Sequence, residues 1–286
     1  MKIYNQQLEA AFRKKGAELL SLVDRVTGQE YIWQADPRHW GRRAPVLFPF
    51  VGRLKQDNYL VGDKKFRMGQ HGFARDMEFN LMELEEDTIR FSLSATPETL
   101  ENYPYRFELL ISYKLIERKL EITYEVANLE SSDLYFSIGG HPAFNCPMIE
   151  GEKRADYRLE FSKAEDAQTH RLEQGLFSGK IEQIFQGKTL NLTEYLFKKD
   201  ALVFKDLKSD RVMLVSDHKK WLTFHFAGFP YLGIWSKSDQ SPFVCIEPWF
   251  GLADSKEHNQ KIESKEGILC LKKYQTFSCS YQVEVH

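Results

Sequence analysis

Alternation of apolar and polar residues dominates the chain. In residues 88–95 (TIRFSLSA) every second side chain is apolar, and the segments 118–126 (RKLEITYEV) and 277–285 (FSCSYQVEV) repeat this two-residue period. The period is typical of β-strands that have one buried and one exposed face. Further strands are predicted at residues 156–161, 211–215, 221–226 and 231–235, and a turn is predicted at residues 61–65.

Helical patterns are few and short. Residues 96–103 (TPETLENY) predict one turn of helix with Thr96 as the N-cap and Pro97 at the first helical position. Residues 191–199 (NLTEYLFKK) predict a second short helix. Many short strands without long helices between them indicate an all-β fold, an antiparallel β-sandwich or barrel. Because no linker, repeat or low-complexity tract interrupts the pattern, we expect residues 1–286 to form a single domain.

Composition narrows the range of partners. Apolar residues make up 42% of the 286 residues, including 21 Phe and 13 Tyr, which is enough for a large core. The 39 Lys and Arg nearly balance the 41 Asp and Glu, so the charge predicts neither nucleic-acid nor membrane binding. The N-terminus lacks the apolar region of a secretory signal, and no apolar run approaches the ~20 residues of a membrane span. We therefore expect a soluble, cytoplasmic protein.

Several chemistries lack their motifs. The four cysteines (Cys146, Cys245, Cys270 and Cys279) are far apart and form no CxxC, so they predict neither a zinc site nor a disulfide framework. No HExxH is present and the histidines are scattered, so the sequence names no metal site. GxSxG, GxxxxGK[ST] and GxGxxG are also absent, which argues against serine hydrolases and nucleotide-binding enzymes.

One carboxylate stands in unusually apolar surroundings. Glu247 lies within residues 242–254 (PFVCIEPWFGLAD), and Pro248 restricts its backbone to extended conformations. A carboxylate presented from an apolar strand is either paired with a cation or kept for chemistry. Paired with Asp200 or Asp254 it would fit a glycosidase, although spacing in the sequence does not give the separation in space.

Two histidines also lie in constrained segments. His71 stands between Gln70 and Gly72 in residues 69–76 (GQHGFARD), and His141 follows two glycines and precedes Pro142 in residues 137–145 (SIGGHPAFN). Glycine allows a ligand to approach the backbone closely. A histidine and a glutamate in a partly desolvated pocket suit paired general acid and base catalysis, because both can have a pKa near neutrality.

Taken together and in order, these segments resemble the aldose 1-epimerase (galactose mutarotase-like) family, and within it the LacX-like branch. The matching stretches cover nearly the whole chain. They are APVLFPFVGRLKQDNY (44–59), MGQHGFARDMEF (68–79), GGHPAFN (139–145), KDALVFKDL (199–207), LGIWS (232–236) and FVCIEPWFGLAD (243–254). The resemblance implies the large twisted antiparallel β-sandwich of that family, the galactose mutarotase-like supersandwich.

The resemblance also implies a reaction and its proton carriers. The family interconverts the α and β anomers of an aldose at C1 by opening and closing the sugar ring, with no metal or organic cofactor. By its motif, Glu247 resembles the family's base, and His141 resembles the acid that serves the ring oxygen. His71 resembles the second catalytic histidine, which binds the sugar.

Substrate-binding roles follow from the same resemblance. Arg53 in VGRLK matches the sugar-binding arginine, and Asp200 in KDALVF matches the aspartate that binds hydroxyl groups. Trp235, Trp249 and Phe144 are candidate platforms for the face of a sugar ring. The expected partner is a small sugar, and the protein is expected to be a monomer or a homodimer.

Two alternatives remain open. The segment HGFAR also occurs in the hexose-6-phosphate 1-epimerase branch, where extra basic residues receive the phosphate. Here Arg75, Arg42 and Arg43 are the residues available for that role, although Arg75 next to Asp76 also predicts an internal ion pair. The other alternative is a non-catalytic carbohydrate sensor on the same fold. Retention of His71, His141 and Glu247 argues against it, because a sensor does not need an acid and a base.

Overall fold

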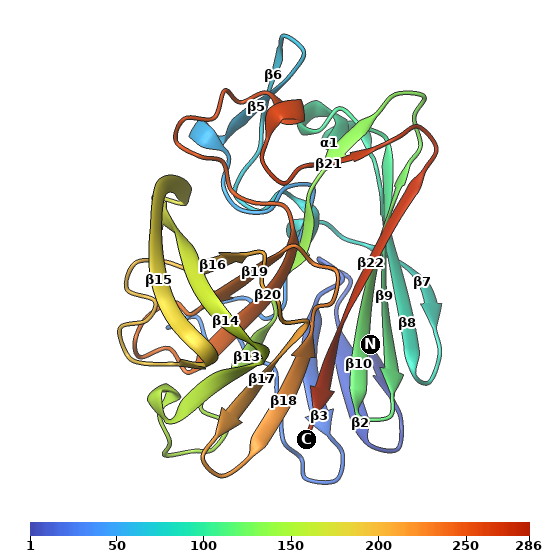
Figure 1. Ribbon diagram of the computed structural model, residues 1–286. Coiled ribbons are helices and arrows are strands. Elements are labelled where there is room, and N and C mark those ends of the chain that lie inside the picture. Colours follow the sequence, from blue (N-terminus) through green and yellow to red (C-terminus); the bar gives the residue numbers. More distant parts are fainter.

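Two large antiparallel sheets account for most of the structure, a computed structural model that describes residues 1–286 (Figure 1). The first has nine strands. In spatial order they are β15 (Leu176–Asn191), β14 (Tyr157–Glu173), β17 (Arg211–Ser216), β18 (Lys220–His225), β22 (Thr276–Val285), β10 (Lys119–Asn128), β9 (Phe107–Ile116), β8 (Thr88–Ser94) and β7 (Asn80–Leu84). The strands predicted from two-residue alternation all lie here except residues 231–235, which form β19 in the second sheet.

The second sheet carries the candidate site. Its members are β16 (Leu202–Lys205), β19 (Tyr231–Trp235), β20 (Phe243–Phe250), β12 (Ile138–Gly140) and β4 (Val46–Leu47), with β13 (Ala143–Asn145) also pairing with β20. Smaller sheets complete the fold. They are β1 (Lys2–Tyr4), β2 (Leu8–Phe12) and β3 (Leu19–Asp24); β11 (Leu134–Phe136) with β21 (Leu269–Leu271); and β5 (Asn58–Val61) with β6 (Lys64–Arg67).

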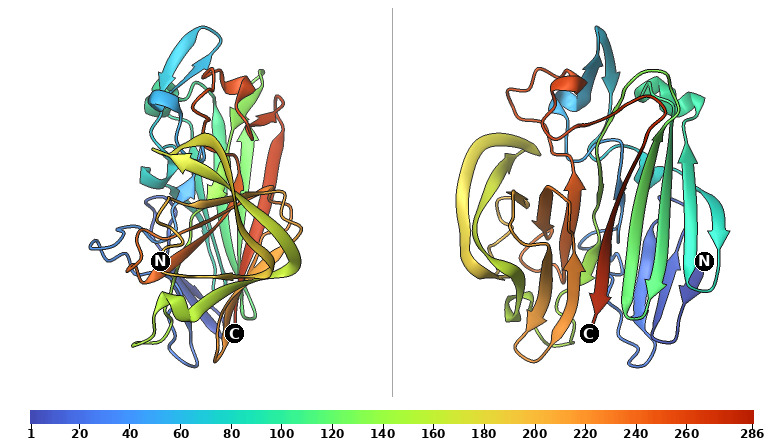
Figure 2. Two further views of the ribbon diagram at one scale, coloured as in Figure 1. Left: turned by 60° about the vertical axis from the view of Figure 1, so that its left-hand side comes forward. Right: turned by 45° about the vertical axis from the view of Figure 1, so that its right-hand side comes forward.

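The two large sheets pack face to face, which confirms the predicted all-β sandwich. Aromatic rings from the two sheets contact one another. The ring centres of Phe144 in β13 and Phe224 in β18 are 6.0 Å apart, and those of Phe250 in β20 and Phe277 in β22 are 5.1 Å apart. A cluster of 64 buried apolar residues runs from Ile3 to Val285. Figure 2 shows the twist of the large sheet from two further sides, with the long β14–β15 hairpin arching out beside the second sheet. Phe144 therefore belongs to the core and is not a sugar platform.

Of the two predicted helices, one is present. Helix α1 (Pro97–Asn102) begins after Thr96, whose hydroxyl accepts a hydrogen bond from the backbone N–H of Thr99 at 3.2 Å, as an N-cap does. The helix predicted at 191–199 is wrong. Its first residues continue the β14–β15 ladder, since the N–H of Leu192 donates to Tyr157, and turns follow. Short 3₁₀ helices occur at Lys55–Asp57, Ala74–Asp76, Arg154–Asp156 and Ile262–Ser264.

Strand β20 explains how an apolar segment can present a carboxylate. Side chains alternate across a strand, so Val244 and Ile246 enter the core between the sheets. Cys245, Glu247 and Trp249 project from the opposite face. The sequence FVCIEPWF is apolar on both sides because both faces of this strand are covered. No helix of this protein is long and apolar enough to cross a membrane.

Candidate active site

A cavity of about 240 Å³ lies over the outer face of the second sheet. Its walls come from segments far apart in the sequence, including the β14–β15 hairpin, the β12–β13 connection and the segment that contains His71. Most of the site residues predicted from the sequence line it: Arg42, His71, Arg75, His141, Asp200, Trp235, Glu247 and Trp249. Arg53, Arg43 and Phe144 do not.

His141 and Glu247 meet at this cavity. The Nε2 atom of His141 lies 3.3 Å from the Oε2 atom of Glu247, and the two side chains are 9% and 2% exposed. Glu247 is fixed by its place in β20, and His141 by a backbone hydrogen bond from its N–H to the carbonyl of Pro45. Neither Oε2 of Glu247 nor Nδ1 of His141 has a hydrogen-bond partner.

Burial moves the two pKa values in opposite directions. Desolvation raises the pKa of Glu247 well above its ordinary value, and the nearby Asp200 carboxylate raises it further. The indole of Trp249 lowers this pKa in part, without reaching hydrogen-bond geometry. Desolvation lowers the pKa of His141 to about 3. Burial thus disfavours the charged form of each group, and a proton held by the pair is favoured on Glu247 over His141.

His71 faces His141 and is a neutral donor. The rings of the two histidines lie 5.8 Å apart and nearly perpendicular. The backbone N–H of Gly52 donates to Nδ1 of His71 at 3.1 Å, which leaves the ring proton on Nε2. Burial lowers the pKa of His71 well below its usual range, and the nearby His141 lowers it further. Nε2 of His71 lies 3.2 Å from the side-chain amide of Gln70, so His71 can donate to a ligand, without carrying a charge, when that ligand takes the place of Gln70.

The backbone that carries His71 is strained. His71 has a φ of 69°, and the following Gly72 has a φ of 70°. A Cβ atom at Gly72 would lie 2.2 Å from the carbonyl oxygen of Phe48, so no other residue fits there. Non-glycine residues rarely adopt positive φ, and such strain concentrates at functional sites. The glycine of the HG pair is therefore required by this turn.

Two tryptophans, Trp249 and Trp235, line the cavity. Trp249 is buried and lies across two neighbouring strands, where a Cβ atom at Gly233 would be 2.5 Å from its ring and one at Gly139 would be 2.7 Å from it. The glycines of the LGIW and GGHP segments thus make room for a flat indole. Trp235 stands edge-on to His141, with ring centres 5.6 Å apart. Flat apolar faces of this kind are suitable for packing against a sugar ring.

Trp40 is a cavity residue that the sequence analysis missed. Its indole stacks on the His141 imidazole at 4.8 Å with an interplanar angle of 25°, and it meets Trp235 edge-on at 5.5 Å. An aromatic face beside an imidazole stabilises the protonated form when it appears. The only signal in the sequence is one tryptophan in the polar segment DPRHWGRR. Its distance from His141 along the chain conceals the contact.

Three cations and one carboxylate surround the acid–base pair. Arg42, Arg75 and Lys237 line the cavity together with Asp200. Arg75 donates to the backbone carbonyl of Gln70 at 2.7 Å, and its Nε atom is buried without a partner. Burial, and repulsion from Arg42, lower the pKa of Arg75 to about 10. The predicted ion pair of Arg75 with Asp76 is long, with 3.7 Å between Nε of Arg75 and Oδ2 of Asp76. Asp76 pairs more closely with Arg42, whose Nη2 atom lies 3.0 Å from Oδ1.

Arg53 lies outside the cavity. Its guanidinium forms two hydrogen bonds with Asp57, at 2.9 and 3.0 Å, and a longer one with the carbonyl of Gln174. Its aliphatic stem packs behind Gly175 at the tip of the β14–β15 hairpin, so that Gly175 lies between Arg53 and the cavity. The structure does not bring the arginine predicted to bind sugar to the site. Arg75 occupies the cavity instead.

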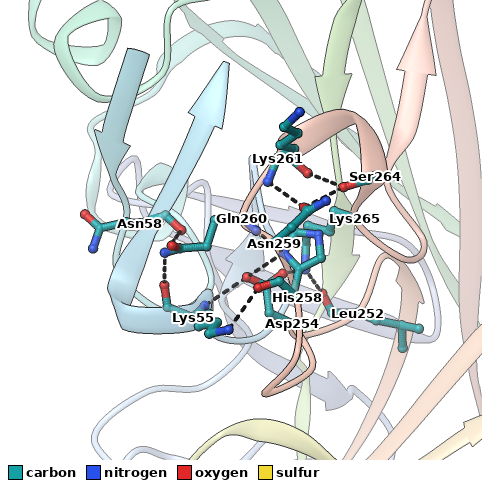
Figure 3. Close-up of polar contacts among 10 residues, drawn as sticks. All are labelled: Lys55, Asn58, Leu252, Asp254, His258, Asn259, Gln260, Lys261, Ser264 and Lys265. Atoms are coloured by element: carbon teal, nitrogen blue, oxygen red, sulfur yellow. Dashed lines mark hydrogen bonds and ion pairs between the residues drawn. The ribbon is translucent and has the colours of Figure 1, made fainter. Parts of the chain in front are cut away.

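Behind the cavity, a buried ion pair anchors the segment after β20 (Figure 3). Asp254 accepts hydrogen bonds from the Lys265 ammonium and from the backbone N–H of Lys55, both at 2.8 Å. The side chains of Asp254 and Lys265 are 1% and 2% exposed. The backbone N–H of Asp254 also donates to the carbonyl of Arg53. Asp254 is thus a structural anchor and does not line the cavity. A glycosidase pair of Glu247 and Asp254 would need both carboxylates in the cavity, so the structure does not support that pair.

Comparison with known protein families gives one match over most of the chain. The family model described as aldose 1-epimerase matches residues 1–266. Among curated proteins, the chromosomal protein LacX of Lactococcus lactis subsp. lactis is 38% identical over 296 aligned positions, which cover 100% of this chain and 99% of that protein.

Solved structures agree with the sequence comparison. A galactose mutarotase related enzyme from Lactobacillus acidophilus is 33% identical, with a TM-score of 0.94 and coverage of 100% of this chain and 97% of the other. A galactose mutarotase-like protein from Lactobacillus casei ATCC 334 is 31% identical, also with a TM-score of 0.94, and coverage is 100% and 99%. Similarity at this level extends over the whole fold, including every segment that lines the cavity.

Proposed function

Since the chain belongs to the aldose 1-epimerase family, we propose that it is a mutarotase, an isomerase that interconverts the α and β anomers of a hexose. The observation that carries the proposal is the single contact between His141 and Glu247, with Nε2 and Oε2 3.3 Å apart at the cavity. The C1 hydroxyl oxygen and the ring oxygen of a sugar are bonded to the same carbon. An acid and a base that serve them must therefore lie side by side, as these two groups do.

Ring opening requires two proton transfers. Glu247 removes the proton of the C1 hydroxyl, His141 protonates the ring oxygen, and the bond between C1 and the ring oxygen breaks to leave an aldehyde. Rotation about the C1–C2 bond then presents the other face of the carbonyl. The reverse transfers close the ring to the other anomer. The proton that leaves His141 is replaced by the one that Glu247 has gained, so the pair carries one proton throughout the cycle.

The opposite pKa shifts fit this cycle. Before ring opening the proton must be on His141, and after ring opening it is on Glu247. Burial favours the second arrangement in the free protein. Binding a sugar shifts the balance back, because a hydroxyl group that donates to the carboxylate lowers the pKa of Glu247. The stacked ring of Trp40 supports the imidazolium form of His141.

The remaining cavity residues would hold the sugar. His71 donates from Nε2 to a sugar oxygen as a neutral group, and Asp200 accepts from hydroxyl groups at the cavity edge. Trp249 and Trp235 pack against the apolar face of the ring. Arg75 takes the role for which Arg53 was predicted, because its guanidinium lines the cavity.

A second candidate is a hexose-6-phosphate 1-epimerase. It is favoured by the three cations, Arg42, Arg75 and Lys237, that line a cavity with only two carboxylates, Asp200 and Glu247. A guanidinium binds phosphate through two parallel hydrogen bonds, so these side chains are suited to a phosphorylated substrate. The acid–base chemistry at C1 would be unchanged.

Saturation-transfer NMR of anomer exchange tests the proposal. We would compare α-glucose, α-galactose and glucose 6-phosphate, each with the protein and with a buffer blank, because water alone equilibrates the anomers. Exchange above the blank supports the proposal. A preference for glucose 6-phosphate that Lys237→Ala removes supports the phosphate branch. Binding of a sugar without faster exchange contradicts catalysis and favours a sensor.

A further inference from the structure

We propose that His141, Cys245 and Glu247 bind a thiophilic divalent ion such as Zn²⁺, and that the bound ion blocks the cavity to sugar. The donor atoms of these three side chains all lie within 4.8 Å of one another, and all three residues are buried. Binding itself does not depend on the proposed function, but the inhibition of anomer exchange does. The reaction at C1 requires no metal, so the ion acts as an inhibitor.

The fold brings the three donors together although the sequence separates them. Cys245 and Glu247 are two residues apart on β20 and project from the same face of that strand. His141 comes from the connection before β13, and Ala143 of β13 pairs directly with Cys245. The widely spaced cysteines and histidines gave no motif, because the cluster is created by strand pairing.

Glu247 supplies an unpartnered ligand atom. Its Oε2 atom is buried and makes no hydrogen bond, and it lies 3.3 Å from Nε2 of His141. A buried polar atom without a hydrogen-bond partner costs free energy, which a bound cation would recover. The Glu247 side chain is 2% exposed, so this feature of the site is independent of the thiol.

The donor set selects the ion. One sulfur, one imidazole nitrogen and one carboxylate oxygen match Zn²⁺. His141 and Glu247 line the cavity, whereas Cys245 is buried in the apolar cluster next to it. Thiolate ligands disfavour Mg²⁺ and Ca²⁺, which prefer oxygen. The thiolate and the carboxylate neutralise the charge of the ion. A neutral complex can form beside Arg42, Arg75 and Lys237, which would repel a site with residual positive charge.

The ion and the sugar would occupy the same place. His141 and Glu247 both line the cavity, and both are ligands in the proposed site. Only deprotonated ligands coordinate a metal, so an ion bound to these two side chains removes them from proton transfer. Sugar and ion therefore compete for the cavity.

Cobalt spectroscopy of the metal-free protein tests the site directly. We expect one Co²⁺ per chain to produce a thiolate-to-cobalt charge-transfer band, and one equivalent of Zn²⁺ to abolish it. Mg²⁺ should have no effect, and a cavity-binding sugar should weaken the band. Cys245→Ser and Cys245→Ala should lose it, with a fall in Zn²⁺ affinity beyond the ~10–100-fold cost of removing an outer-shell partner. Cys270→Ser removes an exposed thiol and is the matched control that should keep it.

The outcomes separate the metal site from the proposed function. If wild type gives no thiolate–cobalt band, or if both Cys245 variants keep it, the site is refuted. If both variants fail to fold, the wild-type protein alone tests the site. A thiolate–cobalt band that weakens when sugar binds then supports the site, and a band that sugar leaves unchanged refutes its place at the cavity. A band in a protein that never accelerates anomer exchange supports the site and refutes the enzyme. Exchange that saturating Zn²⁺ leaves unchanged refutes the inhibition.

Discussion

Nε2 of His141 lies 3.3 Å from Oε2 of Glu247, and both residues line the cavity. They come from different segments, one from the connection between β12 and β13 and the other from the middle of β20. Their opposite pKa shifts have the same cause, burial. This arrangement has measurable consequences for stability, pH dependence and substrate binding.

Replacing Glu247 by Gln should stabilise the fold. Glu247 has a folded-state pKa above its unfolded value of 4.5, so above pH 4.5 the folded protein holds a proton that the unfolded chain has lost. Wild-type stability must then fall as pH rises toward the folded pKa. We expect Glu247→Gln to gain about 1 kcal/mol at pH 7, with a smaller gain at pH 5. Thermal melts at both pH values measure this, with Glu85→Gln as an exposed control. An unchanged or lower melting temperature contradicts the assignment.

The pH profile of catalysed exchange should be broad on the acidic side. The pair holds one proton from about pH 3, where His141 gains a second, up to the raised pKa of Glu247. Activity should therefore stay level above the His141 pKa of about 3 and fall only as the pH passes the raised pKa of Glu247, where the pair loses its last proton. The measurement is exchange rate against pH in the presence of a chelator, with the blank subtracted at each point. A rise centred on the ordinary histidine pKa of 6.5 would show that His141 titrates as an exposed group.

Arg75 and Arg53 should differ in their effect on substrate binding. Arg75 lines the cavity, whereas Arg53 is paired with Asp57 behind Gly175. A charged hydrogen bond contributes about 1.5–3 kcal/mol, so Arg75→Ala should lower kcat/KM by about tenfold or more. Arg53→Ala should change it by less than about twofold, since an exposed ion pair contributes little. Steady-state kinetics on the same sugar compare the two. A larger loss in Arg53→Ala would restore the prediction made from the sequence.

Removing the lysine of the buried ion pair should destabilise the protein. Lys265→Met leaves the Asp254 carboxylate buried with only the Lys55 backbone N–H and the nearby His258 as polar neighbours. Breaking such a pair costs about 3–5 kcal/mol, because one charge remains uncompensated. Urea unfolding measures the loss. Lys261→Met, at an exposed position, is the control and should cost less than about 0.5 kcal/mol. Equal midpoints for the two variants would show that Asp254 is not held by Lys265.

Much of the fold could be predicted from local pattern. The alternation in residues 88–95, 118–126 and 277–285 predicts β8, β10 and β22 because each has one face in the core. Residues 191–199 do not form the predicted helix, because Asn191 ends the ladder with β14 and turns follow it. The extent of the single domain, residues 1–286, stays a prediction.

The site was only partly accessible to the same reasoning. Glu247, His141 and His71 stood out because glycine or proline constrains each segment. Trp40 and Cys245 did not, since their proximity to His141 depends on strand register and loop path. Arg53 matched a motif, yet the β14–β15 hairpin separates it from the cavity. Motifs predicted the candidate proton carriers, and the residues around them could be found only from the structure.

Anomer exchange in Glu247→Gln tests the central claim most directly. Wild type and variant would be compared by saturation-transfer NMR on the sugar that wild type accelerates, with sugar affinity measured by calorimetry and Glu85→Gln as the control. We expect the variant to bind the sugar but to lose the ~10²–10⁴-fold contribution of a positioned base, which brings exchange close to the buffer blank. Exchange at the wild-type rate in a folded, sugar-binding Glu247→Gln protein would contradict the account.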